Sequence, residues 1–78
     1  MIIKKEVVIL QEISIDTEFI KLDQFLKYVS VVQTGGQAKM MISEGIIKIN
    51  GEVVLERGRK IRKNDIVEIE DFDSFVVI

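Results

Sequence analysis

Residues 34–51 read TGGQAKMMISEGIIKING, and they predict a short helix followed by a β-hairpin. Thr34 and Gln37 have the spacing of a capping box, in which each side chain accepts a hydrogen bond from the backbone amide of the other residue. Four residues then recur at i, i+3, i+4 and i+7, the spacing of one helix face: Ala38, Met41, Ile42 and Gly45. Because glycine readily adopts the left-handed backbone that ends many helices, we expect the helix to run from about Gly35 to Glu44.

The residues that follow predict β-structure. Ile46–Ile49 is rich in β-branched residues, and Asn50-Gly51 is typical of a two-residue hairpin, because a type I′ turn needs positive φ at both central positions. Further strands are expected at Val53–Leu55, Ile66–Ile69 and Phe75–Ile78, with turns at Asn64-Asp65 and Asp71–Ser74. The predicted arrangement is a tight antiparallel meander.

A first helix is predicted upstream, where four apolar residues share one helix face: Leu22, Phe25, Leu26 and Val29. Asp23 falls in its first turn, where a carboxylate meets the positive end of the helix dipole. Tyr28 lies off the apolar face; we expect it at the edge of the core, with stacking on a nucleobase as the alternative. The apolar, β-branched run Lys4–Leu10 predicts an added N-terminal strand.

A strand, two helices and several strands in this order predict an α+β domain with two short helices on a small, mainly antiparallel sheet. One core is expected, built from apolar residues of both helices and of the first hairpin strand: Leu22, Phe25, Leu26, Val29, Ala38, Met41, Ile42, Ile47 and Ile49.

Composition argues against several classes of function. The chain has 78 residues, a length typical of one small domain, and it contains no cysteine and no histidine. Without them, disulfides, thiolate metal sites and the commonest general base are excluded, so we expect no enzyme activity, no bound metal and no cofactor. The N-terminal run is too short and too charged for a signal peptide or a membrane span, so we expect a cytoplasmic protein.

Positive charge is concentrated in one segment of a chain whose net charge is -2. Five cations lie within the seven positions Arg57–Lys63, with no acid among them. Such a segment favours a local anion site, although a solvated loop or edge strand is the alternative. A second candidate is Gly35-Gly36 at the start of a helix, where unpaired amides can meet a phosphate and Lys39 lies one turn away; a simple interhelix turn is the alternative.

Taken in order, these segments resemble the S-four RNA-binding domain, a family named for a small-subunit ribosomal protein. The resemblance covers about Phe19 to Glu70 and rests on five pieces: Ile20–Leu26, Gly36–Ile42, Gly45–Gly51, Gly58–Ile61 and Asp65–Val67. It is nearest to the small stand-alone bacterial members, in which Gly-Gly-x-Ala-Lys and Arg-Gly-Arg-Lys occur together. Many members carry Ser-Arg where this chain has Thr34-Gly35, so one arginine contact is absent here.

The resemblance implies two helices on a bent sheet, the αL-type RNA-binding fold, with residues 1–18 as an N-terminal extension and residues 19–78 as the RNA-binding domain. It also implies one RNA-facing surface, made of Gly36, Gln37, Lys39, Arg57, Arg59 and Lys60. To this surface we add Lys48, the cation of the hairpin strand.

The leading hypothesis is a non-enzymatic module that binds structured RNA, such as ribosomal RNA or a ribosome assembly intermediate, through phosphate contacts. No membrane or small-molecule substrate is expected as a partner. One alternative is a protein–protein adaptor of the same fold that has lost RNA binding. Another is a ubiquitin-like β-grasp carrier, which the C-terminal Phe75–Ile78, lacking a Gly-Gly tail, argues against.

Overall fold

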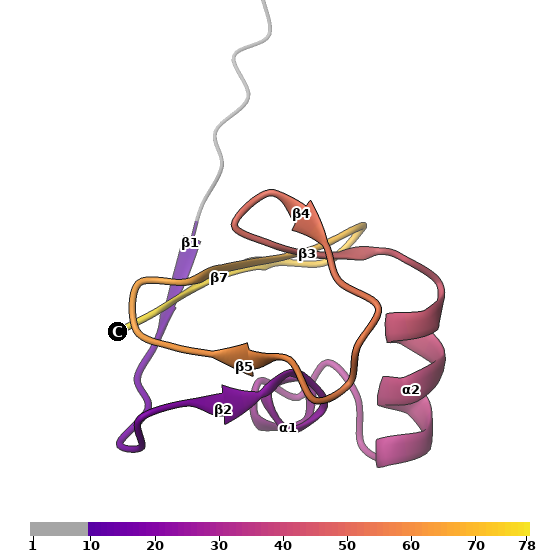
Figure 1. Cartoon of the computed structure of the whole chain (residues 1–78), viewed down its shortest axis with the longest axis horizontal. Coiled ribbons are helices and arrows are strands. Elements are labelled where there is room, and N and C mark those ends of the chain that lie inside the picture. Colours follow the sequence, from indigo (N-terminus) through magenta and orange to yellow (C-terminus); the bar gives the residue numbers. More distant parts are fainter. Residues whose placement is uncertain (1–9) are drawn as a thin grey trace, which may run out of the picture.

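The computed structural model describes residues 10–78 of the chain (Figure 1). It contains two helices, α1 (Leu22–Tyr28) and α2 (Gly35–Ser43). Its strands are β1 (Leu10–Ile13), β2 (Ile20–Lys21), β3 (Ile47–Ile49), β4 (Glu52–Val53), β5 (Lys60–Ile61), β6 (Ile66–Ile69) and β7 (Ser74–Val77). The predicted α+β class with two short helices is therefore confirmed. Within the described residues, no helix is both long and apolar enough to cross a membrane.

Two sheets make up the β-structure. The larger has five strands in the order β1-β7-β6-β3-β4, and only the β1–β7 pair in it is parallel, as the mainly antiparallel prediction requires. The smaller sheet pairs β2 with β5. The simple meander predicted from the sequence is wrong, because β6 pairs with β3 rather than with the strand before it, and β5 leaves the large sheet. This order places Val67 opposite Ile49 and Ile69 opposite Ile47, so that all four side chains are buried on one face.

The added N-terminal strand is observed as β1, which lies at one edge of the large sheet. The strand predicted at Lys4–Leu10 lies outside the described residues, apart from Leu10, where β1 begins.

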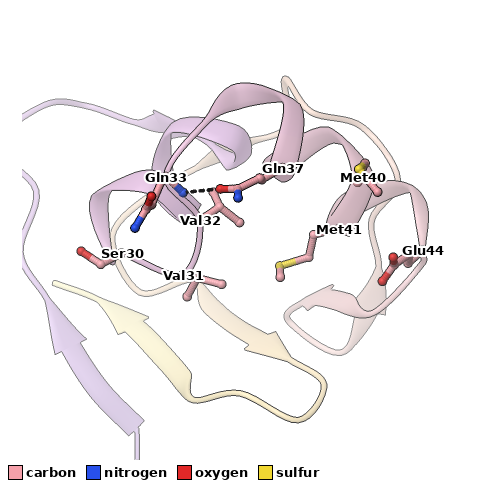
Figure 2. Close-up of a pocket in the computed structure, with 8 residues that line it drawn as sticks. All are labelled: Ser30, Val31, Val32, Gln33, Gln37, Met40, Met41 and Glu44. Carbon is pink, nitrogen blue, oxygen red and sulfur yellow. Dashed lines mark hydrogen bonds between the residues drawn. The ribbon is translucent and has the colours of Figure 1, made fainter.

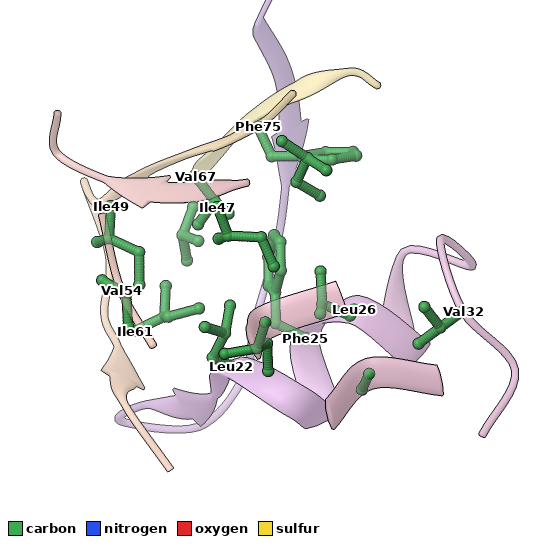
Figure 3. Packing of buried hydrophobic residues seen from close by; sticks show 14 of the residues in the cluster. Leu22, Phe25, Leu26, Val32, Ile47, Ile49, Val54, Ile61, Val67 and Phe75 are labelled. Carbon is green, nitrogen blue, oxygen red and sulfur yellow. The ribbon is translucent and has the colours of Figure 1, made fainter. Parts of the chain in front are cut away.

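The core lies between the inner face of the large sheet and the two helices, as Figure 3 shows. The Phe25 ring of α1 meets the Phe75 ring of β7 edge to face, with centroids 5.6 Å apart. Val29 and Met41 are partly buried against this core, and the other residues predicted for it are fully buried. The periodicity of both helices therefore identified the faces that pack on the sheet.

Residues with positive φ mark the turns that the sequence predicts. Gly45 follows α2 with φ of +73°, and Asn50 and Gly51 have φ of 52° and 86°, as a type I′ turn requires. Asn50 also connects this turn to the next one, since its Nδ2 donates to Asp65 Oδ1 at 2.9 Å and its Oδ1 accepts from the Ile66 amide at 2.9 Å. The hairpin and the β5–β6 turn are thereby held as one unit.

Candidate nucleic-acid interface

The N-terminus of α2 is built by the predicted capping box. Thr34 Oγ1 accepts from the Gln37 amide at 3.1 Å, and Gln37 Oε1 accepts from the Thr34 amide at 3.2 Å. Gln37 Oε1 also accepts from the Gln33 amide at 2.8 Å, so the side-chain oxygen of Gln37 serves the cap and only its Nε2 is left for an outside partner.

The amides of Gly35 and Gly36 open the helix and have no acceptor within it. The surroundings of both glycines are open: a Cβ added at Gly35 would meet no atom within 4 Å, and one at Gly36 would meet only Thr34 Oγ1, at 3.9 Å. Lys39 follows one turn later and is exposed. Two free amides, a partial positive charge and a nearby ammonium group form an arrangement that suits a phosphate oxygen.

The basic segment is fixed by its backbone to the N-terminus of α1. The amide of Leu22 donates to the carbonyl of Arg59 at 2.8 Å, and the amide of Asp23 donates to the carbonyl of Arg57 at 3.1 Å. The N-cap residue, Lys21, contributes no side-chain cap, so these carbonyls take that role. The side chains of Arg57 and Arg59 remain exposed while their backbone is held in place. A cationic loop is thereby presented to solvent in a defined conformation.

Further cations join this segment through the small sheet. Lys21 lies directly opposite Lys60 in the β2–β5 pair. Like charges in this position repel each other, which an anion between them would relieve. Lys60 Nζ lies 4.7 Å from the centroid of the Phe19 ring, and Arg62 Cζ lies 5.8 Å from it. We call the group gathered around the N-terminus of α1 the basic surface; it consists of Lys21, Arg57, Arg59, Lys60 and Arg62.

The residues predicted for the site fall into separate places. In Figure 1, the N-terminal end of α2 lies on the side of the molecule away from the large sheet, whereas the connection from β4 to β5 starts at that sheet and runs across to β5 beside α1. Lys48 is not brought together with them. It alternates with the buried Ile47 and Ile49, so it points out of the sheet face opposite the helices, and it lies across from Glu68 on β6.

The RNA-facing surface predicted from the sequence did not include Lys21 or Arg62. Lys21 lies outside the basic run, and it joins the basic surface only through its pairing with Lys60. Arg62 belongs to the run, but its place beside the Phe19 ring depends on a contact between residues distant in the chain. Tyr28 also differs from expectation: it is 59% exposed rather than packed at the edge of the core, and its hydroxyl donates to the carbonyl of Ser14 at 2.9 Å.

A hollow of about 470 Å³ lies between the α1–α2 connection and α2, where Figure 2 shows Gln33, Gln37 and Met41 around it. The charged side chain that lines it is the acidic Glu44. This hollow therefore does not extend the basic surface toward α2.

Comparisons with known proteins agree with this architecture. A family model described as the S4 domain matches residues 13–78. A protein of Bacillus subtilis (strain 168) named "Probable ribosome maturation protein RlbA" is 53% identical over 66 residues, which are 85% of this chain and 93% of that protein.

Solved structures also resemble the chain. A pseudouridylate synthase structure matches with a TM-score of 0.60 and 33% identity over 67% of this chain, but the match covers only 22% of that chain. The 30S ribosomal protein S4e from Thermoplasma acidophilum matches with a TM-score of 0.58 over 69% of this chain and 29% of that one; at 20% identity, this likeness concerns the fold alone. Because the family model spans most of this chain and the Bacillus relative aligns over most of this chain and nearly all of its own length, we conclude that the chain belongs to the S4 domain family.

Proposed function

We propose that this chain is a non-enzymatic module that binds structured RNA through phosphate contacts, with ribosomal RNA or a ribosome assembly intermediate in the cytoplasm as its target. The observation that carries the proposal is the anchoring of the basic segment. Its carbonyls are hydrogen-bonded to the amides of Leu22 and Asp23, while the side chains of Arg57 and Arg59 stay exposed. Because its backbone is already fixed, such a segment has little backbone conformational entropy to lose when it meets RNA.

The comparisons support the same setting. The Bacillus relative, which is 53% identical over 66 residues, is named for ribosome maturation. The likeness to a pseudouridylate synthase does not favour catalysis, because it is confined to 22% of that enzyme's chain.

Phosphate contacts place a protein on RNA without reading its bases. The contact set that we propose is the basic surface together with Lys39, Gly36 and the free amide nitrogen of Gln37. Lys48 is the least favoured of the predicted residues, because it points away from the others and faces Glu68.

Salt dependence of RNA binding tests the proposal. If about four of these six cations contact phosphates at one time, the logarithm of the affinity should fall with the logarithm of salt concentration at a slope of roughly -3 to -4, or about a hundredfold between 50 and 200 mM. Arg59→Ala should lower the slope by about one and weaken different structured RNAs equally. Its fold should persist, because Arg59 caps α1 with its carbonyl, which alanine also has. Lys48→Ala is the matched control, since it removes one cation from the opposite face of the sheet.

A triple variant with alanine at Arg57, Arg59 and Lys60 gives the decisive comparison in cells. We expect it to fold and to lose the RNA or ribosomal particles that co-purify with the unaltered protein. Undiminished co-purification would contradict the proposal. If the unaltered protein instead recovers a protein partner and shows no salt-dependent RNA affinity, the adaptor alternative is favoured.

A further inference from the structure

A hollow of about 360 Å³ lies beside the basic surface, between the outer side of α1 and the connection from β1 to β2. Its size lies within the range typical of pockets for small ligands. Two aromatic residues line it: Phe19 of the β1–β2 connection and Tyr28 of α1. Lys21 lines it as well, so the hollow and the basic surface share a residue.

Both rings are at least partly open to solvent, and the Tyr28 ring is tethered by a hydrogen bond. The hydroxyl of Tyr28 donates to the carbonyl of Ser14 at 2.9 Å, although the side chain is 59% exposed. This bond fixes an exposed ring that would otherwise be free to rotate. Phe19 is only partly buried, and the cationic groups of Lys60 and Arg62 lie 4.7 and 5.8 Å from the centroid of its ring. Aromatic rings beside cations are the usual platform on which proteins stack unpaired bases.

The polar groups of the hollow favour a base over a bare phosphate. Asp16 lines it and is exposed, and its carboxylate would repel a phosphate placed inside. The same carboxylate can accept a hydrogen bond from a base amino group, and the side-chain amide of Gln24, which also lines the hollow, can donate or accept. The phosphates would lie outside, toward Lys21 and Lys60.

We infer that this hollow binds one unpaired nucleobase of the RNA, stacked against Tyr28 and Phe19, while the adjoining phosphates contact the basic surface. The inference rests on the proposed RNA binding and deepens it. The preferred target is then a structured RNA that carries a bulged or looped-out nucleotide next to its helix, not a uniform duplex.

A pair of RNA hairpins tests the inference with the unaltered protein. One hairpin carries a single unpaired adenosine, and the other has an abasic nucleotide at that position, so both have the same number of phosphates. Since stacking of one base is worth about 1–3 kcal/mol, we expect the abasic hairpin to bind about 5 to 150 times more weakly in 50 mM salt.

Tyr28 supplies a second readout. It is the only tyrosine of the chain, which has no tryptophan, so intrinsic fluorescence reports on this residue alone. The hairpin with the unpaired adenosine should quench this fluorescence, and the abasic hairpin should leave it nearly unchanged. Tyr28→Leu leaves only the Phe19 ring in the hollow and should reduce the preference, while Tyr28→Phe, which keeps a ring at position 28, should retain most of it. Arg59→Ala should weaken both hairpins by the same factor and keep the preference.

Failure of the inference differs from failure of the proposed function. Equal affinity of the unaltered protein for both hairpins, or equal quenching by both, would overturn the base-binding hollow while RNA binding stands. The absence of salt-dependent binding to either hairpin would overturn both. The comparison of the two hairpins needs no variant, so it remains decisive if Tyr28→Leu fails to fold.

Discussion

Gln37 allows the capping of α2 to be separated from phosphate binding, because its side-chain oxygen serves the cap while the helix end is proposed to face RNA. Gln37→Ala removes the acceptor for the amides of Gln33 and Thr34. The variant keeps the Thr34 side-chain cap but loses these hydrogen bonds, and a typical hydrogen bond contributes about 0.5–1.5 kcal/mol to stability. In a domain of this size each kcal/mol lowers the melting temperature by about 4–8 °C, so the loss is measurable by thermal or urea unfolding.

Gln37→Glu is the informative partner of this variant. Glutamate keeps an oxygen acceptor at the same reach and adds a negative charge at the positive end of α2, which should stabilise the fold by about 0.3–1 kcal/mol. The same charge should repel a phosphate near the amides of Gly35 and Gly36. A like charge at about 4 Å in water costs about 1 kcal/mol, or about fivefold in RNA affinity at low salt.

Gln37→Ala should therefore lower the stability and Gln37→Glu should raise it. Gln37→Glu should nevertheless bind RNA more weakly than the unaltered protein. Equilibrium unfolding and RNA titration on the same samples measure both quantities. If Gln37→Glu loses as much stability as Gln37→Ala, the cap depends on more than the oxygen of Gln37. If Gln37→Glu is stable and binds RNA with full affinity, the N-terminus of α2 is not a phosphate site.

Three further predictions concern the fold. Leu26→Ala removes a fully buried side chain and should lower the free energy of unfolding by about 2–5 kcal/mol; an unchanged urea midpoint would contradict the assigned face of α1. Asp65→Ala should lower the free energy of unfolding by about 1–3 kcal/mol, because the Asn50 side-chain amide and the Arg62 backbone amide both donate to its carboxylate. In the same unfolding measurements, Asn50→Gly, which tolerates the positive φ of this turn, should lose less stability than Asn50→Leu. Gly45→Ala should lower the free energy of unfolding by about 1–2 kcal/mol, because alanine is strained at the φ of +73° that this position adopts. Crowding does not contribute, since the nearest atom to the added Cβ, in the Leu55 side chain, lies at an ordinary contact distance of 3.8 Å. Full stability in thermal unfolding would refute this reason.

Local patterns in the sequence were sufficient for the helices, the N-terminal cap of α2 and the hairpin turn. The capping box of Thr34 and Gln37, the end of α2 at Gly45 and the turn at Asn50-Gly51 all depend on residues within a few positions of one another. Each of these signals reflects a steric or hydrogen-bonding requirement of the backbone itself, so no knowledge of the remaining chain is needed. The alternation of Lys48 with Ile47 and Ile49 also indicates that Lys48 points away from the core.

Strand order and the composition of the basic surface depended on tertiary structure. The pairing of β5 with β2, which places Lys60 beside Lys21, joins segments that lie far apart in the sequence. The capping of α1 by the carbonyls of Arg57 and Arg59 is equally invisible in the sequence, because every residue has a carbonyl and the pattern of side chains does not show where it will point. The sequence by itself thus determined where the cations are concentrated and which helix faces are buried. Tertiary structure decided which cations meet around α1 and which aromatic rings lie beside them. The physical reason is the burial of one shared core, because a register that places the apolar faces inward leaves these charged and aromatic side chains together on the outside.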